Sequence, residues 1–223
     1  LGFFQETAAR HAQTISVGVS DLLKHDATWV LRRYRVNIRR HSGLGAVTVR
    51  TWYGPKRNLM SVRLFEAIGE NGEIIADAWS GWILVDIKRG KPVRLDHVLP
   101  EEYYRNAEEV LPDSIGDVVA PDAPETSEAG ESASSFRVRM SELDLNGHTN
   151  HTVYFDWAME SVPDETALNL APVRLDAEYL ASVPRTGVTV RTRKISSSPL
   201  CFAHAVILSD SGLKAAKLTT MWG

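Results

Sequence analysis

The chain has 223 residues, of which 43% are hydrophobic and 24% are charged, and its formal net charge is −3 at pH 7. These fractions are ordinary for a folded protein and exclude general disorder, and the single cysteine, Cys201, excludes a disulfide framework. No apolar run approaches the ~18 residues of a membrane span and no signal peptide is visible, so we expect a soluble, cytoplasmic protein.

The first part of the chain predicts one helix followed by an antiparallel sheet. Residues 3–15 contain Ala8, Ala9 and Ala12, which favour a helix. The pair Asn71-Gly72 is a strong hairpin signal, because both residues tolerate the backbone angles of a tight turn. Four segments rich in Val, Ile, Trp and Tyr are predicted strands, and they cover residues 29–38, 46–53, 59–68 and 73–87.

An acidic connector over residues 99–135 follows the predicted sheet. Its first part, residues 100–111, begins with a proline and two glutamates and predicts a short helix. Residues 112–135 are mostly Ser, Pro, Ala, Asp and Glu, a composition typical of a flexible linker. The connector therefore divides the chain into an N-terminal domain, 1–98, and a C-terminal domain, 136–223.

Charge is distributed unevenly over these three parts. Residues 1–98 carry 15 Lys and Arg against 9 Asp and Glu, a net +6. Residues 99–135 carry 1 against 10, a net −9, and residues 136–223 carry 9 of each. A basic first domain is compatible with an acidic partner, and solvated strand faces are an alternative that charge alone leaves open.

The C-terminal domain repeats features of the N-terminal one in nearly the same register. Val47-Thr-Val-Arg-Thr51 recurs as Val188-Thr-Val-Arg-Thr192, and a Gly followed ten residues later by a Trp recurs as Gly72 with Trp82 and Gly212 with Trp222. We infer two copies of one fold. The second copy opens with a strand over 136–140 and a polar loop before its helix, so we expect a corresponding strand of the first copy to precede Leu1.

The polar loop over residues 141–151 contains Asp144, Asn146 and His148, and Asn150 is a good helix N-cap. A calcium loop is excluded because its twelfth position is Val153 instead of Glu. A metal site at the two loop histidines lacks a clear third ligand. Two interpretations remain: a structural turn that caps the helix, or a catalytic loop that places a possible base beside free backbone N–H groups able to stabilise an oxyanion.

Here the sequence resembles a known family. Asp144-Leu-Asn146-Gly-His148-Thr-Asn150, followed by Tyr154, Trp157 and Glu160-Ser-Val-Pro163, is similar to the plant-type fatty acyl-ACP thioesterases and their bacterial relatives, whose pattern is Asp-x-Asn-x-His-x-Asn-Asn, then Tyr, Trp, Leu-Glu and Pro. Further similarity lies at 4–8, 72–82 and 92–94. The resemblance implies an α+β double hotdog, in which each copy is a long helix wrapped by an antiparallel sheet.

The resemblance also implies a reaction and a site: hydrolysis of the thioester between a fatty acyl chain and acyl carrier protein, in fatty acid biosynthesis, without a metal or other cofactor. Asp144, Asn146 and His148 match the family's catalytic positions. Ser182 stands where the family has Glu and Val183 where the plant enzymes have Cys, so direct attack by water is expected in place of an acyl-enzyme. Ser182 would order a second water, and Glu178, on the same strand face, is either an alternative base or a surface charge of an edge strand.

The remaining expectations concern partners. The acidic carrier would contact basic residues of the first domain, with five arginines as candidates: Arg32, Arg33, Arg35, Arg39 and Arg40. No nucleic acid and no membrane span is expected, and the protein would be a monomer or a homodimer. Alternatives are a hydrolase of acyl-CoA or other acyl-thioesters, a non-catalytic protein that binds acyl-ACP or lipid, and, less well matched by the loop, a hotdog dehydratase.

Overall fold

The computed structural model describes residues 1–41, 45–54, 59–100, 103, 131–144 and 146–223. The chain divides into two compact units, Leu1–Asp117 and Val118–Gly223. The helix predicted over 100–111 lies outside the described residues except for its start and Tyr103, and the predicted linker lies outside them as far as residue 130. None of the described helices is long and apolar enough to cross a membrane.

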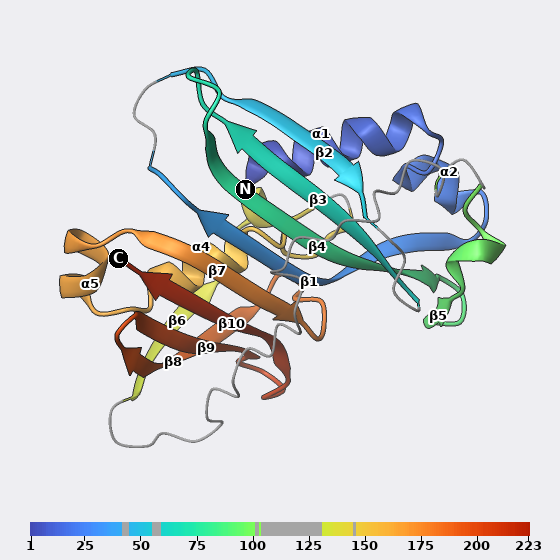
Figure 1. Ribbon diagram of the computed structural model, residues 1–223. Coiled ribbons are helices and arrows are strands. Elements are labelled where there is room, and N and C mark those ends of the chain that lie inside the picture. The colour runs from blue at the N-terminus through green and yellow to red at the C-terminus, as the bar shows by residue number, and fades with distance from the viewer. Residues whose placement is uncertain (42–44, 55–58, 101–102, 104–130, 145) are drawn as a thin grey trace. The chain divides into compact units, whose positions relative to one another are not determined.

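The first unit is an antiparallel sheet with helices on one face (Figure 1). Helices α1 (Gly2–Thr14) and α2 (Val19–Leu23) precede the sheet, whose strand order is β2-β3-β4-β1, with β5 paired to β4. The strands are β1 (Ala27–Ile38), β2 (Thr48–Tyr53), β3 (Met60–Ile68), β4 (Ile74–Asp86) and β5 (Lys91–Val93). The predicted first helix and the four predicted strands are confirmed, and Gly72 between β3 and β4 has a φ of +77°, as the hairpin prediction requires.

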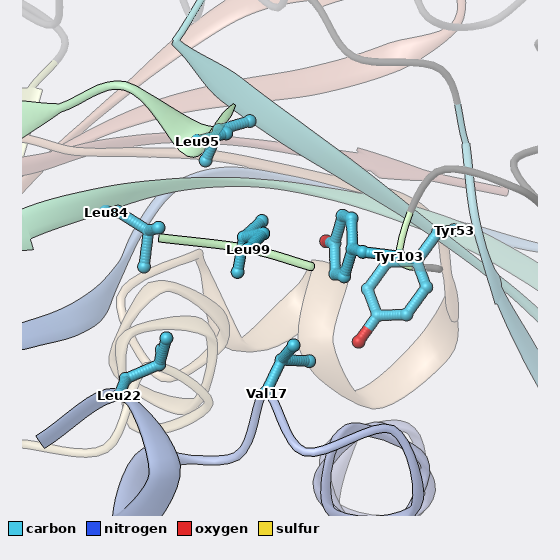
Figure 2. Close-up of a cluster of buried hydrophobic side chains, with 7 residues drawn as sticks. All are labelled: Val17, Leu22, Tyr53, Leu84, Leu95, Leu99 and Tyr103. Atoms are coloured by element: carbon cyan, nitrogen blue, oxygen red, sulfur yellow. The ribbon is translucent and has the colours of Figure 1, made fainter. Parts of the chain in front are cut away.

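The core of the first unit fills the space between its helices and its sheet. Near the start of α1, Phe4 packs on Phe65 of β3 with ring centroids 5.0 Å apart. Figure 2 shows a second cluster, in which aliphatic side chains meet two tyrosine rings: Val17, Leu22, Leu84, Leu95, Leu99, Tyr53 and Tyr103. Leu95 comes from the short helix η1 (Leu95–His97), so the chain after β5 also closes this core.

The second unit repeats this arrangement. Its sheet has the order β7-β10-β9-β8-β6, and α4 (Val153–Met159) lies on one face, followed by α5 (Asp164–Asn169). The strands are β6 (Glu131–Arg137), β7 (Pro172–Tyr179), β8 (Gly187–Ser197), β9 (Leu200–Leu208) and β10 (Lys214–Trp222), and the short helix η2 (Met140–Glu142) follows β6. All strand pairs within the two sheets are antiparallel.

Matching contacts in the two units confirm the duplication. The order β2-β3-β4-β1 corresponds to β8-β9-β10-β7. The indole of Trp82 donates to Ser80 Oγ over 2.7 Å, and the indole of Trp222 donates to Thr220 Oγ1 over 2.9 Å. Gly212, like its counterpart Gly72, has a positive φ, +70°. The α+β class and the two helix-on-sheet copies expected from the sequence are therefore present.

Two predicted boundaries were wrong. The opening strand of the second unit begins at Glu131 instead of residue 136, because the Ser-rich segment pairs with β8 through its backbone from Glu131 opposite Arg193 onward, and that pairing needs no large apolar side chains. The second helix begins at Val153 instead of directly after Asn150, its predicted N-cap, and is only 7 residues long. Asn150 Oδ1 accepts the Thr152 amide over 3.0 Å, so this side chain forms a turn before the helix.

The buried cluster of Figure 2 generates a stability prediction. Leu84 is 0% exposed, whereas Ile87, just beyond the same strand, is 49% exposed. We expect Leu84→Ala to lower the free energy of unfolding by about 2–5 kcal/mol because it leaves a cavity, and Ile87→Ala to lower it by less than about 1 kcal/mol. Urea unfolding of both variants measures the difference, and equal losses would contradict this assignment of the core.

Candidate active-site loop

The loop between η2 and α4 is organised by the Asp144 carboxylate. Asp144 Oδ1 accepts the backbone N–H groups of Asn146 over 2.8 Å and of His148 over 3.1 Å. The Asp144 amide donates to the His148 carbonyl over 2.7 Å, and Gly147 takes a φ of +75° in the turn between them. These bonds close a tight loop whose exposed residues include Asn146 and His148.

The base of the loop is fixed to the segment that follows β7. Thr149 is buried, and both its amide and its hydroxyl donate to the carbonyl oxygen of Val183, over 2.8 and 2.9 Å. The Asn150 amide donates to the Glu142 carbonyl over 2.7 Å, which joins the two ends of the loop. The hydrogen bonds between Thr149 and Val183 therefore bring together two chain segments. His148 directly precedes Thr149, and Ser182 directly precedes Val183.

Ser182 lies outside the strand on which the sequence placed it. Strand β7 ends at Tyr179, and the amides of Leu180 and Ala181 both donate to the Ala215 carbonyl, so the chain leaves the regular ladder before Ser182. The expectation that Glu178 and Ser182 share a strand face was therefore wrong. Ser182 is exposed, while Val183 is fully buried. Among the described residues, the side chains of Asn146, His148 and Ser182 make no hydrogen bonds to one another.

Two tyrosines, one from α4 and one from β7, pack together next to the loop. Tyr154 of α4 packs edge-on against Tyr179 of β7, with centroids 5.2 Å apart, and the Tyr179 hydroxyl donates to the His151 carbonyl over 2.9 Å. Tyr154 also hydrogen-bonds the backbone of Val183, and burial raises the pKa of its hydroxyl, so it stays neutral. In the sequence Tyr154 was noted only as part of the family pattern. Its contact with Val183, which anchors the loop, is seen only in the structure.

His151 occupies the position where the family pattern has Asn. Its ring faces Tyr179, with centroids 6.3 Å apart, and burial lowers its pKa to about 4. It is therefore a neutral imidazole at neutral pH. The sequence considered this residue only as a metal ligand; among the described residues, no group of three His, Cys, Asp or Glu side chains is arranged to hold a metal ion.

The backbone donors expected at the helix start are partly occupied. The amides of Thr152 and Val153 donate to the side-chain and main-chain oxygens of Asn150, over 3.0 and 3.1 Å. These two N–H groups are therefore not available to an oxyanion. The donors that the loop offers to solvent are instead the side chains of Asn146 and His148, both exposed.

Cys201 does not belong to the site. It lies in β9, is 6% exposed, and burial raises the pKa of its thiol, which disfavours the reactive thiolate. The prediction that Cys201 is buried is confirmed.

The basic residues of the first unit are largely committed to local contacts. Arg35 is buried, so it cannot contact a protein partner, and Arg32 and Arg33 are half-buried. Arg39 pairs with Asp77 over 2.6 Å and Arg40 with Glu73 over 2.8 Å, although both arginines remain exposed.

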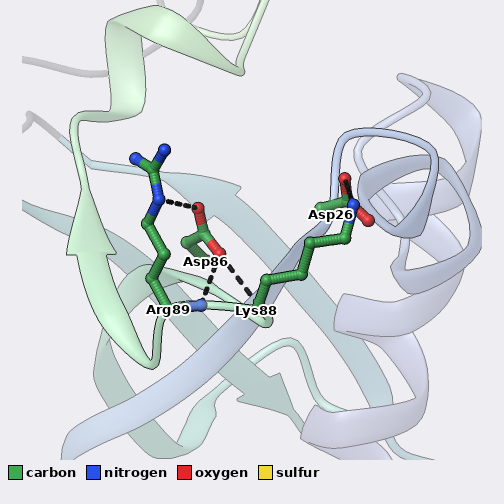
Figure 3. A network of polar contacts seen from close by, with 4 residues as sticks. All are labelled: Asp26, Asp86, Lys88 and Arg89. Atoms are coloured by element: carbon green, nitrogen blue, oxygen red, sulfur yellow. Dashed lines mark hydrogen bonds and ion pairs between the residues drawn. The ribbon is translucent and has the colours of Figure 1, made fainter.

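A second basic group was missed by the sequence analysis. In the turn after β4, Asp86 Oδ1 accepts the amides of Lys88 and Arg89, and the Lys88 ammonium pairs with Asp26 over 2.6 Å (Figure 3). The side chains of Lys88 and Arg89 are 72% and 80% exposed. This turn therefore presents two more cations at the surface, beside carboxylates of the same chain.

Comparison with known proteins adds to this geometry. Residues 1–104 match the family model "Acyl-ACP thioesterase N-terminal domain", and residues 125–223 match "Acyl-ACP thioesterase C-terminal domain". A palmitoyl-acyl carrier protein thioesterase of Gossypium hirsutum is 26% identical over 89% of this chain and 50% of its own length. An oleoyl-acyl carrier protein thioesterase of Arabidopsis thaliana is 22% identical over 98% of this chain and 68% of its own. The chain spans about half the length of several curated relatives that it matches.

Solved structures show the same fold. The 12:0-ACP thioesterase from Umbellularia californica superposes with a TM-score of 0.81, 22% identity, and coverage of 100% of this chain and 87% of that one. A putative oleoyl thioesterase from Lactobacillus plantarum gives a TM-score of 0.80 at 19% identity, covering 96% and 83% of the two chains. The double hotdog expected from the sequence is thereby confirmed.

The hydrogen bonds of Asp144 predict that its side chain stabilises the loop, and substitution by Ala and by Asn separates the loss of the acceptor oxygen from the loss of the negative charge. Asp144→Ala removes the acceptor of two backbone amides, and we expect it to lower the free energy of unfolding by about 1–3 kcal/mol. Asp144→Asn retains an oxygen at this position and should lose less than about half of that. Urea unfolding of the two variants decides, and wild-type stability of Asp144→Ala would show that the carboxylate does not organise the loop.

The low pKa of His151 predicts acid sensitivity. Its folded pKa of about 4 lies below the ordinary value of 6.5, so on acidification the unfolded chain takes up a proton first. Stability should fall as pH drops from about 6.5 towards 4, by up to about 1.4 kcal/mol per pH unit from this residue. Urea unfolding at pH 7 and pH 5 should show a smaller loss in His151→Asn than in wild type. His97→Asn, an exposed control, should follow wild type; parallel losses in all three would refute the prediction.

Proposed function

Because the chain belongs to the acyl-ACP thioesterase family, we propose that it hydrolyses the thioester between a fatty acyl chain and acyl carrier protein, releasing a free fatty acid and the carrier. The observation that carries the proposal is the loop closed by Asp144, which presents Asn146 and His148 to solvent beside the segment of Ser182. The same proposal assigns the protein to fatty acid biosynthesis in the cytoplasm, as a monomer or homodimer.

The geometry supports direct attack by water. His148 would accept a proton from a water molecule as its oxygen attacks the thioester carbonyl carbon, and Asn146 would donate a hydrogen bond to the carbonyl oxygen as it gains negative charge. The C–S bond then breaks, and the carrier thiolate takes the proton from His148. Asp144 holds both residues through their backbone amides, so it is a positioning residue in this scheme.

A covalent intermediate has little support. The family's Cys position is the buried Val183, and Cys201 is buried in β9. Ser182 is exposed and lies next to the loop anchor, where it could order a second water molecule but offers no carboxylate base. Its replacement of the family's Glu favours one alternative: a protein that binds acyl-ACP or lipid and hydrolyses it slowly or not at all.

The carrier is the second element of the proposal. An acidic carrier would be attracted by the exposed cations of the first unit, Arg39, Arg40, Lys88 and Arg89. Each of them already lies near a carboxylate of the chain, so the attraction would be moderate and would weaken with salt. Hydrolysis rates for one acyl group on acyl carrier protein and on coenzyme A, measured at low and high salt, distinguish this carrier from the alternative of acyl-CoA.

The mechanism predicts which substitutions remove activity. Asn146→Ala and His148→Ala should each slow hydrolysis of acyl-ACP by about 100-fold or more and leave the melting temperature unchanged, because both side chains are exposed. His97→Ala is the matched control and should keep full activity. Wild-type rates in either loop variant would overturn the assignment.

Ser182 requires its own experiment. If it only orders water, Ser182→Ala should slow hydrolysis by less than about tenfold, and Ser182→Glu should raise the rate by restoring a carboxylate beside the loop. Release of free fatty acid from radiolabelled acyl-ACP measures both. Intact acyl-ACP after long incubation with stoichiometric wild-type protein would instead favour the non-catalytic alternative.

A further inference from the structure

Two exposed arginines flank a buried valine at the end of β6. Phe136 stacks on Trp157 of α4, with ring centroids 6.1 Å apart, so it faces the helix, and Val138 is only 1% exposed. The backbone of Arg139 is still extended, with φ −87° and ψ 157°. Because side chains of an extended chain alternate between its two faces, Arg137 and Arg139 point to the side away from α4. Both are exposed there.

A third arginine lies beside these two. The ladder between β6 and β8 places Arg137 opposite Gly187, and the Val138 amide donates to the Thr186 carbonyl over 3.0 Å. Arg185 directly precedes Thr186 and is exposed. The segment 137–139 therefore runs antiparallel beside residues 185–187, at one edge of the second unit. We call the three exposed cations of this edge the arginine cluster: Arg137, Arg139 and Arg185.

Most carboxylates around the arginine cluster are covered. The Arg139 side chain is 80% exposed, whereas that of Glu142, 3.9 Å away, is 20% exposed. Asp144 of the loop is half-buried and binds two backbone amides. Asp210, between β9 and β10, is exposed and lies 3.4 Å from a threonine hydroxyl of this edge. Of these charged groups, an approaching molecule therefore meets three exposed guanidiniums and one exposed carboxylate.

The arginine cluster is attached to the candidate active-site loop at two points. Arg139 directly precedes η2, and its amide donates to a carboxylate of that helix over 2.7 Å, at the start of the loop. Arg185 follows the anchor residue Val183 by two residues, so their Cα atoms are at most about 7 Å apart. The Val183 carbonyl binds Thr149, which directly follows His148. The three cations therefore lie close to the side chains that the proposed reaction uses.

An exposed methionine adds an apolar contact to this surface. Met140 directly follows Arg139 and is 65% exposed. Protein interfaces are enriched in Met and Arg relative to the rest of a protein surface. Charges steer an oppositely charged partner towards such a surface, and an apolar side chain gains free energy when the contact excludes water. The surface therefore suits an acidic protein that has to present a reactive group to the loop.

We propose that the arginine cluster and Met140 are the docking surface for the acidic carrier, which thereby places its thioester at Asn146 and His148. The inference rests on the proposed function for the identity of this carrier. Guanidiniums bind the carboxylates of such a partner through paired, charge-assisted hydrogen bonds. The exposed cations of the first unit lie within 4 Å of carboxylates of their own chain, so they attract the carrier at longer range.

Binding of the carrier tests the surface directly. Holo acyl carrier protein, which has the pantetheine arm but no acyl chain, is titrated at low and high salt into the wild type and the triple variant Arg137→Gln, Arg139→Gln, Arg185→Gln. The variant should bind at least about tenfold more weakly at low salt and respond less to added salt. Lys194→Gln is the matched control: it removes an exposed cation of β8, about 23 Å along the strand from Gly187, and should bind as wild type does.

Hydrolysis separates docking from chemistry. One acyl group is presented on acyl carrier protein and on pantetheine alone, which has the thioester arm without the carrier. The ratio of kcat/KM for the first substrate to that for the second should fall at least about tenfold in the triple variant, through KM of the carrier substrate. Equal losses on both substrates would show that the arginines serve the loop itself, and would overturn the docking inference.

The remaining outcomes also decide. Wild-type affinity of the triple variant for the carrier, or an equal loss in Lys194→Gln, overturns the inference and leaves the proposed function standing if both thioesters are hydrolysed. Binding of the wild type to phosphatidylglycerol and phosphatidylcholine vesicles, without binding to the carrier, overturns it in favour of a lipid surface. Should the wild type bind the carrier and hydrolyse neither thioester, the proposed function fails, and the affinity of the triple variant still decides whether the carrier docks here.

Discussion

The carbonyl oxygen of Val183 accepts two hydrogen bonds from Thr149, and the geometry of the candidate site depends on this contact. It attaches the loop of Asp144 to the segment that follows β7, while Asn146 and His148 of the same loop stay exposed. Since Thr149 and Val183 are both buried, solvent does not compete for these bonds. Tyr154 of α4 also hydrogen-bonds the backbone of Val183 and so holds the same residue in place.

This anchor separates residues that hold the loop from residues that can act. Asp144 has its Oδ1 directed at two backbone amides, so its role is to set the loop conformation. Asn146 and His148 are free to meet a substrate because the backbone around them is already satisfied. The short helix contributes less than expected, since Asn150 occupies two of its first amides. Chemistry at this site must therefore come from side chains.

Periodicity and repetition could predict most of the fold. Asn71-Gly72 identified a hairpin because the pair has strong local backbone preferences. The repeated pentapeptide ending at Thr51 and Thr192 identified the duplication because the two segments are identical in sequence. The start of strand β6 was predicted five residues too late, since its serines show little hydrophobic pattern and are ordered by pairing with β8. Ser182 was misplaced because the end of β7 is decided by contacts of Leu180 and Ala181 with Ala215, which are distant in sequence. The loop residues were identified from the family pattern, but Val183 as their anchor was not.

The duplication also shows how one scaffold holds different buried polar groups. In the second unit the fully buried His204 has a hydroxyl partner on each ring nitrogen, Thr192 Oγ1 and Thr220 Oγ1. Thr192 faces His204 in the strand register, whereas its counterpart Thr51 faces Phe65, so the first unit has an aromatic ring where the second has the imidazole. The Thr51 hydroxyl instead accepts a hydrogen bond from Arg63, two residues earlier on β3, whose guanidinium lies over the Tyr53 ring. The repeated threonine is therefore kept as a buried hydrogen-bonding group in both copies, while its partner changes because the facing strand carries a different residue.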